Sequence, residues 1–244
     1  MEHLLETAAA NQRRAREIIR TTGLEAIWRS VGAEPRLVGS LRTGLLMTHR
    51  DIDYHIYSAP LRTADSFAAM ARLAQDRHIR RVEFANLLDA EDRCLEWHAQ
   101  YVDDEGAAWQ IDMIHMETGS PWDGYFERVA DRIAAVLTDE TRLTILRLKY
   151  ETPPAEKIPG IRYYEAVLRD GVRTREEFAA WLAAHPAGGD RHLDALTDRT
   201  RGPFFLHRTY VFSAPAASYN RKRFQKQTAK KRNMQHGTPE HTPA

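Results

Sequence analysis

Two aspartates, Asp51 and Asp53, stand one residue apart and open the stretch 51–58, in which polar and apolar residues alternate. On a β-strand, residues i and i+2 lie on the same face, roughly 6.6 Å apart. We therefore expect both carboxylates to point the same way, with Ile52 and Tyr54 buried behind them. Oxygen ligands of this kind suit Mg²⁺ ions that are held jointly with the phosphates of a substrate.

A Gly-Ser pair precedes these aspartates. The sequence predicts a short strand from about Pro35 that runs into Gly39-Ser40 and is followed by a short helical turn. Gly39 has no side chain and lets a phosphate approach the backbone. Ser40 offers a hydroxyl and an amide at or near a helix N-terminus, where anions are favoured. Arg42, two residues further on, is a candidate phosphate contact.

The whole arrangement resembles the nucleotidyltransferase superfamily of the DNA polymerase beta type. The pattern of that superfamily is Gly-Ser, three residues, Gly, about six residues and Asp-x-Asp, and it stands here as Gly39-Ser40, Gly44 and Asp51-Ile52-Asp53. The resemblance covers about residues 35–116 and is nearest in layout to the small-molecule, antibiotic-type members. It implies an α/β (α+β) fold, with a small mixed β-sheet flanked by helices and then a helical C-terminal region.

The resemblance also implies an activity. A nucleoside monophosphate would move from a nucleoside triphosphate, such as ATP, to the hydroxyl of an acceptor, and pyrophosphate would leave. Two Mg²⁺ ions, for which Mn²⁺ is a substitute, would be bridged by Asp51 and Asp53. Gly39, Ser40 and Arg42 would bind the nucleotide.

A third carboxylate is needed on a later strand beside the first two, if the resemblance holds. Asp112 is the natural candidate, because apolar neighbours place it in the middle of the strand expected over 107–116. It would complete the site of the metal that activates the acceptor. Glu96 is its nearest rival, and a strand acid paired with an arginine is the alternative role for Asp112.

The hairpin that contains these two acids has a predictable register. The residues 94–102 alternate cleanly and are separated from the next strand by a turn. A three-residue loop, 104–106, with its glycine in the left-handed region, pairs Asp103 with Ala107 and sets His98 opposite Asp112. This register collects polar residues on one face, whereas a slip by one residue would reverse both faces.

Other basic residues have weaker claims to a role. His55 shares the face of the two aspartates and is either a substrate contact or a solvated strand histidine. His49 and Arg50 directly precede Asp51 and fit a polar turn. Lys149 and Arg147 lie on a predicted helix and either reach a triphosphate or belong to its solvated face.

Helices dominate the remaining pattern. We expect them over the first 30 residues and over 64–76, where Thr63 is the expected N-cap. Thr174 and Glu177 form a capping box at the start of the last helix. The helices expected after Pro121 span 123–137, 139–151, 160–170 and 175–185. These elements suggest a catalytic domain over 1–120, a helical region over 121–212 and a basic, flexible tail over 213–244, whose simplest role is to keep the chain soluble.

Charge is unevenly distributed along the chain. The tail 213–244 has a net charge of +6, and residues 1–212 have a net charge of −5. The acidic body favours a cationic or neutral small molecule as the acceptor. The tail points instead to nucleic acid such as tRNA, and a protein acceptor or a catalytically silent nucleotide-binding or RNA-binding relative are further alternatives.

Composition narrows the class of protein. The chain has 244 residues, of which 43% are hydrophobic and 28% are charged, as in ordinary globular proteins. A single cysteine, Cys94, excludes a disulfide framework and indicates a reducing compartment. No run of 18 apolar residues and no signal-peptide pattern occurs, so we expect a cytoplasmic protein without a membrane contact.

Overall fold

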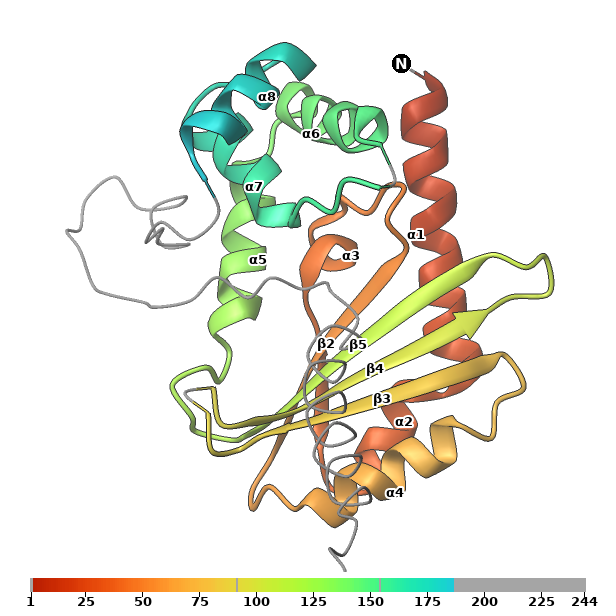
Figure 1. Cartoon of the computed structure of the whole chain (residues 1–244). Coiled ribbons are helices and arrows are strands. Elements are labelled where there is room, and N and C mark those ends of the chain that lie inside the picture. The colour runs from red at the N-terminus through yellow and green to blue at the C-terminus, as the bar shows by residue number, and fades with distance from the viewer. Residues whose placement is uncertain (1, 91, 154, 187–244) are drawn as a thin grey trace, which may run out of the picture. The chain divides into compact units, whose positions relative to one another are not determined.

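The computed structural model describes residues 2–90, 92–153 and 155–186 (Figure 1). All of them belong to the first of two compact units, which ends at Arg208. The last part of the expected helical region, 187–212, and the basic tail lie outside the described residues. The helices and strands are α1 (Glu2–Thr22), α2 (Leu24–Arg29), β1 (Glu34–Leu37), α3 (Gly39–Thr43), β2 (Asp51–Ser58), α4 (Thr63–Leu73), β3 (Ile79–Leu87), β4 (Cys94–Val102), β5 (Ala108–Glu117), α5 (Tyr125–Val136), α6 (Asp139–Glu151), α7 (Gly160–Tyr164), the π-helix η1 (Glu165–Arg169) and α8 (Arg175–Ala184).

The five strands form one mixed sheet with the order β1-β2-β5-β4-β3. β2 and β5 run parallel, whereas the three other neighbouring pairs are antiparallel. The parallel pair is central because α4 and the β3–β4 hairpin are inserted between its two strands in sequence. The expected fold class, a small mixed sheet flanked by helices, is confirmed.

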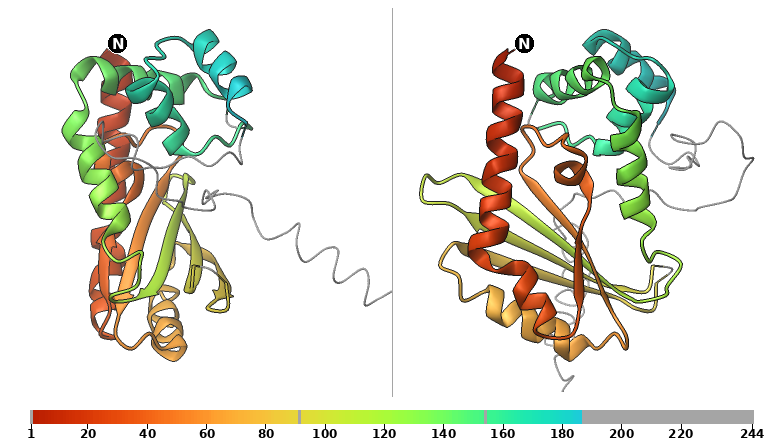
Figure 2. Two further views of the ribbon diagram at one scale, coloured as in Figure 1. Left: turned by 90° about the vertical axis from the view of Figure 1, so that its left-hand side faces the viewer. Right: turned by 180° about the vertical axis from the view of Figure 1, so that it is seen from behind.

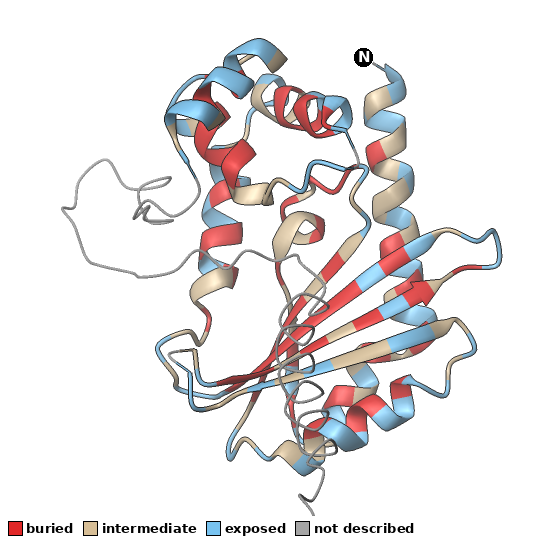
Figure 3. Cartoon of the chain, viewed as in Figure 1, coloured by how far each residue is buried: buried red, intermediate tan, exposed pale blue. Residues whose placement is uncertain are grey.

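One face of the sheet packs on α1, α2 and α4, which lie in front of it in the right-hand view of Figure 2. Trp28 of α2 is fully buried there and donates its indole N–H to the sulfur of Met113 on β5. Burial therefore alternates along β4, with Trp97 and Ala99 buried and His98 between them partly exposed (Figure 3). The opposite face carries the polar residues of these strands, together with the buried Ile114 and Met116 near the end of β5.

A second hydrophobic core joins α5, α6, α7, η1 and α8, and the N-terminal part of α1 contributes Ala8. The segment between α3 and β2 connects the two cores. Leu45 and Met47 pack in the helical core, whereas Leu46 between them packs in the sheet core. The helical region is thus attached directly to the residues that precede the two aspartates.

The hairpin between β4 and β5 has the predicted register. The Asp103 N–H donates to the Ala107 carbonyl at 3.1 Å, and Gly106 has a φ of +82°. His98 lies opposite Asp112. The Asp103 carboxylate accepts hydrogen bonds from two backbone amides of the loop, which stabilises the tight turn.

Helix starts were predicted with mixed success. The capping box of Thr174 and Glu177 is present at α8. The N-cap expected at Thr63 is wrong, because α4 already begins at that residue and Arg62 is its N-cap. The extended Arg62 carbonyl accepts the first helical hydrogen bonds, from the amides of Asp65 and Ser66. In the described part of the chain, no helix has the length and apolar character needed to cross a membrane.

Candidate active site

Three carboxylates lie on adjacent positions of the central parallel pair. Asp51 and Asp53 open β2, and Asp112 lies in the middle of β5. The register pairs Asp53 directly with Asp112, and neighbouring strands are about 4.8 Å apart. Glu96 lies one strand further away on β4 and opposite Ile114. The tertiary structure therefore brings Asp112, rather than Glu96, beside the two aspartates.

The three carboxylates repel one another. Burial, then the charge of Asp112, raises the pKa of Asp51 above its usual value. Burial, then the charges of Asp112 and Asp51, raises the pKa of Asp53 well above its usual value. The ionised site is therefore electrostatically unfavourable by itself, and a bound cation would relieve the repulsion.

Gly39 has a conformation and a neighbour that exclude a side chain. Its φ is +67°, and a Cβ built on it would lie 2.0 Å from Oδ2 of Asp53. The backbone N–H of Ser40 donates to the Asp53 carboxylate, and the Val38 N–H donates to the Asp53 carbonyl at 2.9 Å. The space that we expected a phosphate to use beside Gly39 is thus filled by Asp53, and the Gly-Ser turn fixes this carboxylate.

Asp112 is buried, and two side chains hold its carboxylate, one from β4 and one from β5. Its Oδ1 lies 2.5 Å from Nδ1 of His98 and accepts a hydrogen bond from Nε2 of Gln110 at 2.8 Å. Nε2 of His98 lies 3.0 Å from Glu96. Burial alone would lower the pKa of His98, but hydrogen bonds to Asp112 and Glu96 raise it to about 10. His98 is therefore positively charged at neutral pH and donates at both ring nitrogens.

Lys149 of α6 supplies a second cation. Its buried Nζ donates to the Leu45 carbonyl at 2.9 Å and to the Tyr164 hydroxyl at 3.2 Å. Its charge lowers the pKa values of both Asp51 and Asp53, against the larger effect of burial. The helical region thus places a positive charge within electrostatic reach of the carboxylates.

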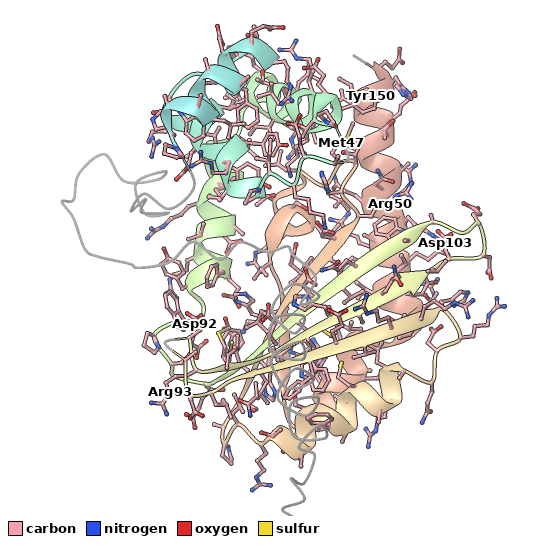
Figure 4. The ribbon with its side chains drawn as sticks, viewed as in Figure 1. Met47, Arg50, Asp92, Arg93, Asp103 and Tyr150 are labelled. Carbon is pink, nitrogen blue, oxygen red and sulfur yellow. The ribbon has the colours of Figure 1, made fainter. Side chains whose placement is uncertain are left out.

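The loop before the aspartates is fixed by α1 and α6. Asn11 donates to the Met47 carbonyl at 2.7 Å, and Figure 4 shows Met47 between these helices. Gln12 and Arg142 both donate to the Gly44 carbonyl, at 3.0 Å and 3.2 Å. These contacts span more than 30 residues in sequence, so no local pattern predicts them.

Arg42 is engaged by another helix. Its guanidinium makes two hydrogen bonds, at 2.8 Å and 2.9 Å, with the Asp131 carboxylate of α5. It also donates to the Leu37 carbonyl at 3.0 Å. A phosphate at Arg42 would have to compete with Asp131.

His55 is not a solvated strand histidine. It is 3% exposed, and its ring packs against Phe126 of α5 with the centroids 4.6 Å apart. Burial lowers its pKa to about 3, so it is neutral. The expectation of a solvent-facing residue is wrong, because Phe126 of α5 covers the imidazole.

The three remaining basic residues, His49, Arg50 and Arg147, lie in different environments. His49 lowers the pKa of Asp51 through its charge. The Arg50 guanidinium lies 5.7 Å from the centre of the Trp109 ring. Arg147 is exposed and donates to the Arg173 carbonyl, so it connects α6 to the turn before α8.

The donor set fits a divalent cation that shares its ligands with a substrate. Carboxylate oxygens are the ligands of Mg²⁺, which is usually held by one or two protein carboxylates together with phosphates. In the described residues, no three His, Cys, Asp or Glu side chains are already arranged to hold an ion by themselves. Burial, and then mutual repulsion, raises the pKa values of Asp51 and Asp53, and a bound cation would relieve the repulsion.

Two residues of the site were not recognised as functional from the sequence. Gln110 and His98 contact Asp112, and the hairpin register was the signal that could have identified both. Lys149 was considered for a phosphate contact. Its approach to Leu45, which is 104 residues away in the chain, depends on tertiary packing.

No protein-family model matches the sequence, and no curated protein matches it. Among solved structures, the Cid1 poly(U) polymerase with bound MgGTP has a TM-score of 0.48 and 13% identity, over 67% of this chain and 52% of that one. The GLD-2/RNP-8 complex has a TM-score of 0.45 and 8% identity, over 85% of this chain and 78% of that one. This chain thus spans about half the length of the Cid1 protein. Likeness of this degree does not assign a function, which has to follow from the residues of the site.

Proposed function

We propose that this chain is a metal-dependent nucleotidyltransferase that moves a nucleoside monophosphate from a nucleoside triphosphate to an acceptor hydroxyl. The observation that carries the proposal is the pairing of Asp53 with Asp112 in the parallel ladder, behind the Gly39-Ser40 turn. Three acceptor-only groups on one face have little reason to coexist in a structural sheet, because their mutual repulsion is unfavourable. A reaction that brings cations and phosphates to them explains the arrangement.

The roles of the residues follow from their positions. Asp51, Asp53 and Asp112 would hold one or two Mg²⁺ ions, which when bound supply charge stabilisation for the attacking and leaving oxygens. Asp112 is buried and its Oδ1 contacts His98, so its other carboxylate oxygen would be placed to accept the proton of the acceptor hydroxyl. Ser40 would bind the terminal phosphates with its hydroxyl, because its backbone amide already donates to Asp53.

Lys149 would stabilise the triphosphate. Its ammonium group comes from α6 and already acts electrostatically on Asp51 and Asp53. A phosphate chain bound to the carboxylates through cations carries negative charge, which a buried ammonium favours. The helical region 121–212 would thereby complete the nucleotide site of the domain 1–120.

An RNA hydroxyl is our first candidate for the acceptor, and a small molecule is the second. The basic tail, with a net charge of +6, supports RNA because phosphate backbones bind clusters of lysine and arginine. The net charge of −5 over residues 1–212 supports a cationic small molecule. The tail separates these candidates, since its removal should weaken transfer to RNA and leave transfer to a small molecule unchanged.

The first experiment is a titration of each nucleoside triphosphate with and without Mg²⁺, followed by thermal unfolding. Binding to the native state should raise the melting temperature by mass action. We expect a magnesium-dependent rise with the preferred nucleotide, and its loss in the double variant Asp51→Ala/Asp53→Ala. Absence of a rise with every nucleotide would contradict the proposal. A rise without transfer to RNA or to small hydroxyl compounds would indicate a catalytically silent relative.

The second experiment measures transfer of a labelled nucleotide to a short RNA by the full chain and by a variant that lacks residues 214–244. An RNA acceptor predicts that the truncated chain loses most of its transfer at physiological salt. Equal transfer by both chains would dismiss the tail as an acceptor contact. Asp51→Ala serves as the inactive control, and activity within about tenfold of the wild type, or ~1.4 kcal/mol of barrier, would rule out its metal role.

A further inference from the structure

His98 lies between two carboxylates on the polar face of the sheet. Its Nδ1 is 2.5 Å from Oδ1 of Asp112 and its Nε2 is 3.0 Å from Oε1 of Glu96. All three residues come from the antiparallel pair β4 and β5, in which His98 and Asp112 are direct partners. The imidazole is therefore held at both ends, and both ends are carboxylates.

The contacts of the Asp112 carboxylate with His98 and Gln110 are both made to one of its two oxygens. His98 and Gln110 both act on Oδ1, at 2.5 Å and 2.8 Å. Two donors on one oxygen oppose rotation of the carboxylate about its Cβ–Cγ bond, so Oδ1 and Oδ2 are not interchangeable. The side chain of Asp112 is 5% exposed, whereas that of His98 is 28% exposed, so His98 is the outer residue of the pair.

We propose that His98 is a positioning residue for Asp112, and that Glu96 fixes the imidazole from the other side. Oδ1 is held by His98 and Gln110, and Oδ2 is presented at a fixed position for the cation and the acceptor. The inference rests on the proposed function, since it assigns to His98 the task of orienting the third metal-binding carboxylate. Glu96, the rival candidate for that carboxylate, takes a supporting role instead.

The geometry offers a matched set of variants. His98→Ala removes both contacts of the imidazole. His98→Asn keeps a donor close to the place of Nδ1 but does not reach Glu96. Glu96→Gln keeps a side chain that can still hydrogen-bond to Nε2, so it is the control with the least expected effect.

The first readout is binding of Mn²⁺ alone, measured by electron paramagnetic resonance without nucleotide. Outer residues that orient metal ligands typically contribute about 10–100-fold to metal affinity or activity. We expect His98→Ala to weaken Mn²⁺ binding by about that factor, and His98→Asn to restore it to within about threefold of the wild type. The double variant His98→Ala/Asp112→Asn should bind no more weakly than Asp112→Asn, because both changes act on the same ligand.

The second readout is the imidazole signal of His98 in nuclear magnetic resonance. A short hydrogen bond to a carboxylate shifts the Nδ1 proton strongly downfield, and Asp112→Asn should move this signal back. Unchanged melting temperatures of all variants would show that the fold is retained. A third readout, the Mg²⁺ concentration for half-maximal transfer, should rise in His98→Ala and return in His98→Asn.

Two results would overturn the inference. One is wild-type Mn²⁺ affinity and Mg²⁺ requirement in His98→Ala. The other is an equal defect in His98→Ala and His98→Asn, which would mean that the hydrogen bond to Asp112 is not what matters. Failure of the proposed function looks different: the wild type itself would transfer no nucleotide. The imidazole signal would then still decide whether His98 holds Asp112.

Discussion

Replacing Gly39 with alanine tests whether the turn at this residue positions the Asp53 carboxylate. The φ of +67° belongs to the left-handed region, where a residue with a Cβ loses about 1–2 kcal/mol. A Cβ there would also lie 2.0 Å from Oδ2 of Asp53, about 1.4 Å inside the shortest ordinary contact of 3.4 Å. The Asp53 carboxylate must therefore move by more than an ångström or abandon its bond to Ser40.

Gly23→Ala is the matched control. Gly23 has a φ of +65°, and nothing lies within 4 Å of the position of its Cβ. Both variants should therefore lose about 1–2 kcal/mol of unfolding free energy, or roughly 2–8 °C of melting temperature, through backbone strain. Gly39→Ala should in addition lose about 100-fold in transfer, because a displacement of about 1 Å in a reacting group has effects of that size. Gly23→Ala should keep its activity.

The steric clash between a Cβ at position 39 and the Asp53 carboxylate can also be measured without any substrate. In the background Asp53→Ala the carboxylate is absent and only the Cβ of residue 53 remains, 3.0 Å from the position of the new Cβ, so adding Gly39→Ala should destabilise the protein less than it does in the wild type and by an amount closer to that of Gly23→Ala. Urea unfolding of the four proteins gives the coupling between the two positions. Additive effects of Gly39→Ala and Asp53→Ala, or Gly39→Ala activity within about threefold of the wild type, would refute the reasoning.

Three further predictions concern charge and burial. In metal-free protein, Asp53→Asn should raise the melting temperature at pH 8, because folding raises the pKa of this carboxyl and its ionised form destabilises the native state. The gain should shrink as the pH falls toward the usual aspartate pKa of 3.8, and a gain independent of pH would contradict this reasoning. Folding lowers the pKa of His55 to about 3, so the neutral imidazole contributes stability above pH 6.5 that is lost as the pH falls from there. The melting temperature of His55→Phe should therefore fall less than that of the wild type between pH 7 and pH 5. Lys149→Met leaves the Leu45 carbonyl without its donor and should lower the unfolding free energy in urea by about 1–3 kcal/mol and raise the KM for the triphosphate, whereas the exposed control Arg147→Met should change stability by less than about 0.5 kcal/mol.

Much of the fold was predictable because its patterns are local. The bounds of β4, Cys94–Val102, agree with the predicted strand, since its residues alternate and a turn follows directly. The loop length then determined the pairing of His98 with Asp112, because only one register keeps polar residues on one face. The helix α6, Asp139–Glu151, likewise has the predicted bounds.

Predictions failed where a neighbour far away in sequence decides the environment. His55 alternates with apolar residues as an exposed histidine would, yet Phe126 of α5 covers it. Arg42 stays a candidate phosphate contact, and its ion pair with Asp131 of α5 was likewise not predicted from the sequence. In both cases the partner lies more than 70 positions further along the chain, so the local periodicity of the sequence does not predict the contact.

The sequence alone predicts the chemistry to which the residues of the candidate site are suited. The identity and spacing of Gly39, Ser40, Asp51 and Asp53 predict oxygen ligands on one strand face, because the side-chain period of a strand is two. Only the tertiary structure decided which later acid joins them. Asp112 and Glu96 were both eligible by pattern. The parallel ladder between β2 and β5 sets Asp112 beside Asp53, since strand order and register depend on contacts that the whole chain makes.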